Sequence, residues 1–342
     1  MRDYTGQFIY LGIDVHKLTY SVTAIHQGQI IKRDKMQACP QKLVLYCKKF
    51  FIGASIYSAY EAGFCGFSLH RYLIENGINN IVVHAASIEI AARERVKNDK
   101  RDSLKIATQL SAGRLNCIYI PSIEREAFRS ISRLREKLIR DKTRLSVQMK
   151  SFLNLNGMIS SSKRVSRSWV LDFLSISDDR EIFFYLKTLA KRWIATDDEI
   201  KIIEEKLKEQ ASKEIDLEKI YRSVPGIGPI ASRLLINELG DMSQFKNERV
   251  LFSYTGLTPR EYSSGENVRV GHISRQGKPV LRRILVQAAW TAIKKDKGLK
   301  KIFEKISIRA GKKKAIIGIA RRLIGHVRAC LQKNEPYKYK EI

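Results

Sequence analysis

Four acidic residues in the first third of the chain have the types and spacing that could carry chemistry. Asp14 lies near the end of an apolar stretch, residues 8–17, and Glu61 directly follows another apolar stretch. Asp99 and Asp102 are three residues apart at the start of a segment with helical spacing, so on a helix they share one face. Carboxylates are the ligands that Mg²⁺ or Mn²⁺ prefers, and four of them can hold two ions about 4 Å apart around a scissile phosphate.

Simpler explanations stay open for each acid taken alone. Asp14 could cap a turn toward His16, and an acidic pair at a helix start is favoured by the helix dipole. A carboxylate on an apolar strand is nevertheless costly unless it is paired, hydrogen-bonded or bound to a metal. No set of His and Cys residues typical of zinc accompanies the four acids. Together they predict a magnesium or manganese site.

A serine in the last third of the chain is a candidate nucleophile. Ser264 precedes a glycine in a loop rich in cations, and Ser263 lies directly before it. A serine hydroxyl attacks phosphate only if its proton is removed and the developing charge is compensated. A turn serine in a basic phosphate-binding loop is the alternative. The cations expected to contact nucleic acid here are Arg260, Arg269, Arg275, Lys278 and Arg282.

A second motif in the same region, residues 220–230, has the form of a helix-hairpin-helix turn. Pro225 ends the preceding helix, and Gly226 and Gly228 leave backbone N–H groups free at the start of the next one. Such groups are suited to receive a DNA phosphate. A plain corner between two helices is the alternative.

The elements that must position the acids form an α/β sheet with mixed strand directions. Three strands linked by hairpins come first, and helix and strand then alternate. This order is typical of the ribonuclease H type of fold, which we assign to residues 1–122. The expected strands cover 8–17, 20–25, 30–33, 55–60 and 80–84, and the expected helices cover 41–51 and 67–73.

The middle of the chain, residues 123–216, is predicted to be helical. Two charged segments carry narrow apolar seams, which favours either a coiled coil between subunits or a helical hairpin within one chain. Residues 160–168 have the composition of a basic linker, and residues 217–342 form a third, mainly helical domain. The seam residues are Ile131, Leu134, Leu138, Leu145, Phe152, Ile200, Ile203 and Leu207.

The composition restricts the class of partner. Among 342 residues, 63 Lys and Arg against 35 Asp and Glu give a formal net charge of +28, which points to nucleic acid. No apolar run is long enough to span a membrane, so a membrane partner is not expected. The five cysteines form no CxxC pair, which fits reduced thiols and a cytoplasmic, nucleoid-associated protein.

Six short motifs in order carry a resemblance to a known family. They are GIDVHK, YEAG, KNDKRD, VPGIGPIAS, GLTPREYSSG and ISRQGKPVLRR. In this order they resemble the DEDD transposases of insertion sequences, the IS110 group, also known as bridge-RNA-guided recombinases. The resemblance spans nearly the whole chain and is weakest between residues 121 and 218.

The resemblance implies a RuvC-like domain whose acidic tetrad is Asp14, Glu61, Asp99 and Asp102. It also implies a C-terminal transposase domain with Ser264 as nucleophile, a covalent phosphoserine intermediate, double-stranded DNA and a non-coding bridge RNA as partners, and a synaptic tetramer. A metal-dependent nuclease of the Holliday-junction-resolvase kind, with water as nucleophile, is the alternative. A non-catalytic nucleic-acid-binding protein is the other.

Overall fold

The computed structural model describes residues 2–88, 99–158, 164–178, 180–261 and 270–339. The chain divides into two compact units, Met1–Ile120 and Pro121–Ile342. The second unit contains both the helical region and the C-terminal region that the sequence analysis separates. The boundaries 1–122, 123–216 and 217–342 therefore stay a prediction.

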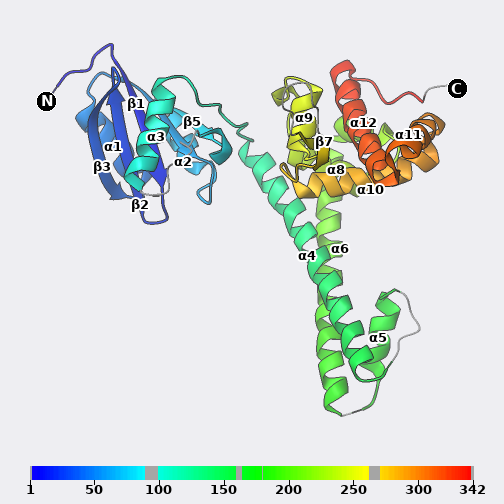
Figure 1. The fold of residues 1–342 in the computed structure, drawn as a ribbon. Helices are drawn as coiled ribbons and strands as arrows, with labels where there is room; N and C mark the ends of the chain where they lie inside the picture. Colours follow the sequence, from blue (N-terminus) through cyan, green and yellow to red (C-terminus); the bar gives the residue numbers. More distant parts are fainter. Residues whose placement is uncertain (1, 89–98, 159–163, 179, 262–269, 340–342) are drawn as a thin grey trace. The chain divides into compact units, whose positions relative to one another are not determined.

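The first unit is built on a five-stranded sheet in the order β3-β2-β1-β4-β5 (Figure 1). The central strand β1 (Phe8–Val15) is antiparallel to β2 (Thr19–His26) and parallel to β4 (Ser55–Glu61). The outer strands are β3 (Gln29–Gln37), which is longer than predicted, and β5 (Asn79–Val83). The mixed α/β sheet expected from the sequence is confirmed, and it fits a RuvC-like fold.

The hydrophobic core of this unit lies on one face of the sheet. Ile9, Leu11 and Ile13 alternate along β1 and are almost completely buried. They pack against α1 (Pro40–Phe50) and α2 (Ser68–Glu75). This alternation leaves the even-numbered residues of β1 on the opposite face.

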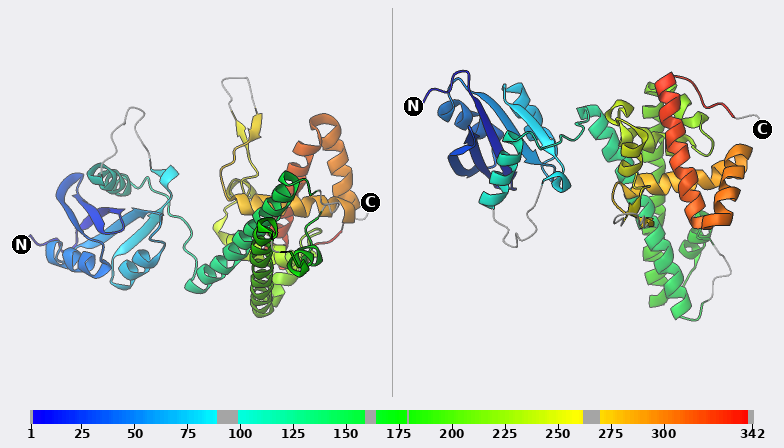
Figure 2. Two further views of the ribbon diagram at one scale, coloured as in Figure 1. Left: turned by 90° about the horizontal axis from the view of Figure 1, so that it is seen from below. Right: turned by 45° about the horizontal axis from the view of Figure 1, so that its top comes forward.

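The helix α3 (Asp99–Ser111) covers that opposite face (Figure 2, left). It crosses β1 at Gly12, where a Cβ atom would overlap the backbone carbonyl of Ser103 and the backbone amide of Ala107. The neighbouring strand adds a buried hydrogen bond of 2.9 Å between Thr23 Oγ1 and Ser103 Oγ. Glycine is therefore what allows strand and helix backbones to touch.

The second unit is mainly helical. None of the described helices is long and apolar enough to cross a membrane. Its helices are α4 (Ile123–Leu155), α5 (Arg167–Ser175), α6 (Glu181–Lys213), α7 (Ile215–Ser223), α8 (Pro229–Leu239), α9 (Glu248–Tyr254), α10 (Pro279–Lys295), α11 (Lys297–Ala310) and α12 (Lys312–Lys333), with strands β6 (Pro259–Glu261) and β7 (Val270–Ile273). Two 3₁₀ turns complete the described elements, η1 (Ala85–Ser87) in the first unit and η2 (Met242–Gln244) here.

The two long helices α4 and α6 run antiparallel side by side within one chain (Figure 1). Lys142 pairs with Asp197 at 2.6 Å, and Arg135, seven residues earlier, pairs with Glu204 at 2.6 Å, seven residues later. The helical hairpin within one chain is thus present. The segment 160–168, predicted to be a linker, gives its last two residues to α5, which packs on α6.

The apolar seam predicted along α4 is wrong in its first half. Leu134 is 47% exposed, whereas polar residues of α4 are buried in its place. The reason is that this half of α4 faces polar side chains of α8, which sequence periodicity cannot reveal. The buried residues of α4 are Arg129, Ser132, Glu136, Leu145, Met149 and Leu153.

Asn237 of α8 is the centre of this polar contact and is completely buried. Its amide nitrogen donates to Ser132 Oγ at 2.8 Å and to Gln210 Oε1 at 3.2 Å. Its backbone carbonyl accepts a hydrogen bond of 2.8 Å from Arg129 Nε. A buried network of this kind stabilises one relative position of α4, α6 and α8, because a shift of any of these helices would leave a buried polar group without its hydrogen-bond partner.

Glu238, the next residue, is held by two cations. Arg133 donates from Nε at 2.6 Å and Nη2 at 3.0 Å, and Lys278 Nζ lies 2.7 Å from Oε2. Burial raises the pKa of Glu238, but the hydrogen bonds and charges of Arg133 and Lys278 outweigh burial and hold that pKa at about 2. The carboxylate is therefore ionised at neutral pH and joins α4, α8 and the start of α10.

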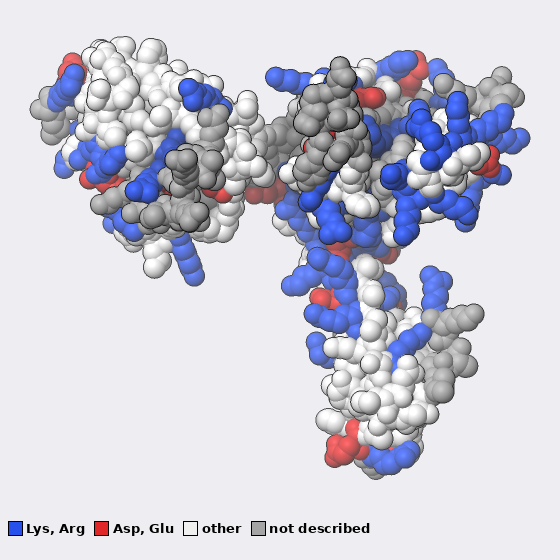
Figure 3. Space-filling model, viewed as in Figure 1, with Lys and Arg blue, Asp and Glu red and all other residues white. Residues whose placement is uncertain are grey.

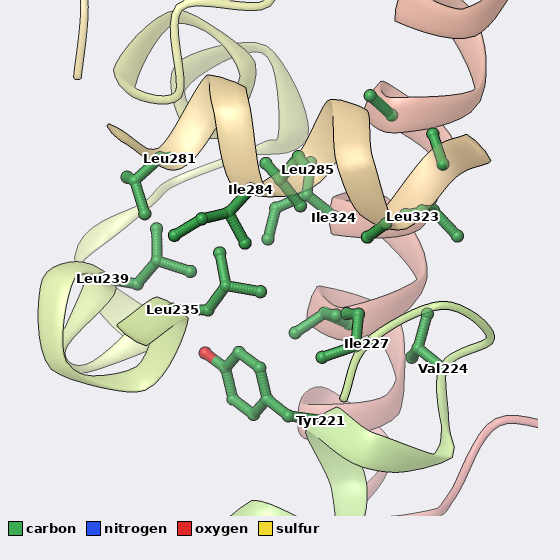
Figure 4. Close-up of a cluster of buried hydrophobic side chains, with 14 of the residues drawn as sticks. Tyr221, Val224, Ile227, Leu235, Leu239, Leu281, Ile284, Leu285, Leu323 and Ile324 are labelled. Atoms are coloured by element: carbon green, nitrogen blue, oxygen red, sulfur yellow. The ribbon is translucent and has the colours of Figure 1, made fainter. Parts of the chain in front are cut away.

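The core of the C-terminal bundle gathers around the α7–α8 turn (Figure 4). Val224 and Ile227 of this turn are buried with Leu235 of α8, and α10 and α12 close the cluster with Leu285 and Leu323. The turn is therefore a packed part of the bundle.

Replacing Gly12 by alanine should destabilise the first unit by about 3 kcal/mol, because the added methyl must push α3 away from β1. Hydrogen exchange of α3 peptides in the full chain measures this as faster exchange. Gly63→Ala is the control, since a Cβ there meets only the Glu61 carbonyl at 3.9 Å. Unchanged α3 protection in Gly12→Ala would contradict the close contact.

Replacing Glu238 by glutamine should destabilise the second unit by about 3 kcal/mol at pH 7, because Arg133 and Lys278 lose the charge of their buried partner. The folded pKa of Glu238 is about 2, below its ordinary value of 4.5, so this stabilisation is present above pH 4.5 and disappears as the pH falls toward 2. The difference between wild type and variant should shrink over that range.

Urea unfolding followed by tryptophan fluorescence measures this difference, since all three tryptophans lie in the second unit. Glu205→Gln is the control, because Glu205 is exposed and pairs only with Lys208 on the same helix. A difference between wild type and Glu238→Gln that stays constant down to pH 2.5 would contradict the assigned pKa.

Candidate active site

Two of the predicted metal-binding acids lie on neighbouring strands. The parallel pairing of β1 with β4 runs from Phe8 opposite Ser55 to Ile13 opposite Tyr60. Asp14 and Glu61 are the next residue of each strand. Alternation places both on the face that α3 covers, at the carboxyl ends of parallel strands. The fold therefore brings these two acids, 47 positions apart in the sequence, to one edge of the sheet.

Asp14 has a basic neighbour in the following turn. His16 Nε2 lies 3.1 Å from Asp14 Oδ2, and the Asp14 side chain is 20% exposed. The local contact toward His16 that the sequence left open is thus present. It lies beside one carboxylate oxygen, Oδ2, which is itself buried.

The other two acids lie in the first two turns of α3. Asp99 is its first residue, and its side chain lies outside the described residues. Asp102 precedes Ser103, whose carbonyl oxygen touches β1 at Gly12, two residues before Asp14. The Asp102 carboxylate is 3.4 Å from Lys105 Nζ, a distance typical of a weak pair. The start of α3 is thus anchored on the strand that carries Asp14.

The donor set suits a hard divalent cation. Asp14, Glu61 and Asp102 offer only carboxylate oxygens, as Mg²⁺ or Mn²⁺ requires. In the described part of the chain, no three His, Cys, Asp or Glu side chains lie close enough together to hold a metal ion. The Asp99 side chain, the fourth member, lies outside the described residues.

The candidate serine lies in sequence between β6 and β7, two strands that form an antiparallel ribbon. Pro259 pairs with Ile273 and Glu261 with Val270. The connecting residues 262–269, which contain Ser263, Ser264 and Arg269, lie outside the described residues. The role assigned to these three residues stays a prediction.

The predicted phosphate-binding cations divide into two groups. Arg260 and Arg275 are exposed at the ribbon base. Lys278, in contrast, pairs with Glu238 and lies 5.0 Å from the Tyr254 ring centroid. Arg282 donates to the Gly256 carbonyl at 3.2 Å and the Gln276 carbonyl at 3.3 Å. Lys278 and Arg282 therefore stabilise the loops around the ribbon.

The glycines of the predicted hairpin also differ from each other. Gly226 has φ +86° and packs so closely on α10 that a Cβ would overlap the Ala288 carbonyl oxygen. Gly228 is exposed, has open space around it, and caps α8, which has no side-chain cap. The corner between two helices that the sequence left open is present at Gly226. A phosphate contact at Gly228 stays a prediction.

Sequence reasoning missed two residues that position the site. Gly12 had a signal, since a glycine inside an apolar strand marks close approach of another backbone. Glu238 had none, because it lies in an apolar helix and its partner Arg133 is 105 positions away.

Comparison with known proteins supports the assignment over most of the chain. A family model of DEDD transposases matches residues 11–156, which contain all four acids. The model described as "Transposase IS116/IS110/IS902 family" matches residues 218–304, which contain Ser264.

Curated relatives cover still more of the sequence. A putative transposase, y4qE, from Sinorhizobium fredii is 27% identical over 85% of this chain and 73% of its own length. The transposase for insertion sequence element IS1111A from Coxiella burnetii is 24% identical over 96% of this chain and 91% of its own length. The transposase for insertion sequence element IS1533 from Leptospira borgpetersenii is 27% identical over 82% of this chain. The fold, the pair of acids on parallel strands and these matches agree that the chain belongs to the DEDD transposases of the IS110 family and is a DNA transposase.

Proposed function

We propose that this transposase cleaves and rejoins DNA by means of its acidic tetrad and a serine of its second unit. The observation that carries the proposal is the placement of Asp14 and Glu61 at adjacent strand ends, with α3 fixed on the same strand at Gly12. Asp99 and Asp102 complete the tetrad from α3.

Asp14, Glu61, Asp99 and Asp102 are the residues that would hold Mg²⁺ or Mn²⁺. When bound, such an ion supplies positive charge that polarises a phosphodiester and stabilises the charge of the transition state. The acids would fix where that ion, and through it the phosphate, lies at the sheet edge. His16, beside Asp14, keeps one side of that carboxylate occupied.

Ser264 is the proposed nucleophile. Its Oγ loses a proton and forms a bond to phosphorus, the bond from phosphorus to the 3′ oxygen breaks, and a proton restores the 3′-hydroxyl. The 5′ phosphate stays on the serine, so the number of phosphoester bonds is conserved. Attack by the 3′-hydroxyl of another strand reverses the step and needs no external energy source.

The partners we propose are double-stranded DNA, at the element ends and the target, and a non-coding bridge RNA. The net charge of +28 supports polyanionic partners. Arg260 and Arg275, exposed at the ribbon base, are the described cations best placed to contact phosphate, and Arg269 and Gly228 are further candidates. A synaptic tetramer acting on cytoplasmic, nucleoid DNA completes the proposal.

Replacing Ser264 by alanine should abolish the covalent protein–DNA adduct, because the attacking oxygen is gone, while DNA affinity changes less than about twofold. A denaturing gel of end-labelled DNA detects the adduct. Ser263→Ala is the matched control and should keep it. An adduct kept in Ser264→Ala and lost in Ser263→Ala would assign the nucleophile to Ser263. Cleaved DNA that carries no protein in the wild type would indicate water as nucleophile.

Replacing Asp14 by asparagine should lower divalent-ion-dependent cleavage by at least about 100-fold, because a neutral amide is a weak ligand for a hard cation. DNA binding in EDTA should be unchanged. Asp216→Asn makes the same chemical change at a side chain that is 87% exposed on α7, and it should cleave normally. Normal cleavage by Asp14→Asn would remove the tetrad from the mechanism.

A further inference from the structure

The base of the β6–β7 ribbon forms one wall of a groove of about 530 Å³ whose other wall is the start of α12. Leu257, Ile273 and Ile317 contribute apolar surface to the groove. Arg275 comes from the ribbon side, and Lys313, Lys314 and Arg321 come from α12. No Asp or Glu is among the described residues that line it. The groove is therefore lined by apolar surface with cations on both sides.

The cations of the groove are not neutralised by acids of the protein. In the described part of the chain, no carboxylate pairs with Arg275, Lys313 or Lys314, and Arg321 lies 4.8 Å from the ring centroid of Phe252. On α6, by comparison, Lys206 and other exposed lysines pair with glutamates of the same helix. Figure 3 shows many Lys and Arg side chains over the C-terminal helices of the second unit. The groove is therefore a concentration of unpaired positive charge.

The first turn of α12 breaks a rule of helix electrostatics. It begins with three lysines, Lys312–Lys314, has no acid, and its cap Gly311 offers no side-chain hydrogen bond. Cations at the positive end of a helix dipole are unfavourable. The start of α4, with the cap Ser122 and the acid Glu124 in its first turn, shows the favourable arrangement in the same unit. An anion bound at this point would remove the repulsion, and such local conflicts are typical of binding sites.

We propose that this groove binds an unpaired strand of DNA. Phosphates would lie on Lys313, Lys314, Arg275 and Arg321, and sugars and bases would cover the apolar surface. A duplex presents phosphates on its outside, so it would place charge against Ile273 and Ile317, whereas a single strand can turn its apolar parts inward. Glu248 lines the adjoining hollow beyond Arg321. Its negative charge would repel phosphates, so the surface suited to a DNA strand ends there.

The choice of DNA rests on the proposed function, because β6 and β7 flank in sequence the segment that contains Ser264. A strand held here would be the one whose end has been freed by cleavage. The groove itself consists only of described residues. Binding to it can therefore be measured separately from the chemistry.

The test is binding of a fluorescent deoxythymidine oligomer to the full-length double variant Lys313→Ala/Lys314→Ala, in EDTA so that no cleavage takes place. We expect affinity at about 100 mM salt to fall roughly tenfold, and the slope of log affinity against log salt to become shallower by about 1.4 for two lost phosphate contacts. Lys206→Ala/Lys208→Ala, which removes the same charge from exposed positions of α6, should change neither. Lys313→Arg/Lys314→Arg should keep binding, which excludes misfolding as the cause.

Unchanged oligomer affinity in the double alanine variant would overturn the proposal, and so would an equal or larger loss of duplex binding or of binding to a uridine oligomer. The adduct assay distinguishes this result from failure of the proposed function. A wild type that forms no phosphoserine adduct but loses strand binding in the variant keeps the groove and rejects the serine chemistry. Adduct formation together with unchanged strand binding rejects only the groove.

Discussion

The contact between Gly12 of β1 and the backbone of α3 is the constraint on which the proposed metal site depends. Hydrophobic burial holds the other face of the sheet, and such contacts tolerate shifts of side-chain rotamers. At Gly12 no side chain stands between strand and helix, so direct backbone contact sets the distance of closest approach. Because Ser103 makes this contact and Asp102 precedes it, the position of the acid relative to β1 follows from backbone geometry.

In the second unit, one set of cations holds helices together through ion pairs, and another set is exposed to solvent. Arg133 and Lys278 are neutralised by Glu238, and Arg233 is buried between Glu214 and Glu218. Burial raises the pKa of Glu218, and the hydrogen bond from Ser232 and the nearby arginines only partly oppose this. Such cations hold helices together and are not available to DNA. A surplus of positive charge therefore indicates a polyanionic partner, and only the structure identifies which cations are available to contact it.

The sequence predicts the first unit well because its signals are local. Alternation along residues 8–15 and the hairpin at Gly28 specify neighbouring strands, and the acids at strand ends follow from them. The second unit is harder because its decisive contacts are distant in sequence. Nothing near Leu134 indicates that it is exposed, and nothing near Lys278 indicates that it pairs with Glu238. Polar residues buried against polar partners mimic a solvent-exposed face in any periodicity analysis.

The same physical device explains why the predicted hairpin is a corner. Gly226 lets the α7–α8 turn touch α10 at Ala288, just as Gly12 lets α3 touch β1. In both units a glycine brings a segment that carries candidate site residues into backbone contact with the scaffold, and the polar residues beside it are then displayed from a rigid base. Gly228, two residues further on, is exposed and caps α8. Burial of Ile227 in the core holds the start of α8 in place. Rigid support from Gly226 and an open N-terminus at Gly228 are thus complementary parts of one turn, and a packed corner would be the more precise platform for the proposed phosphate contact.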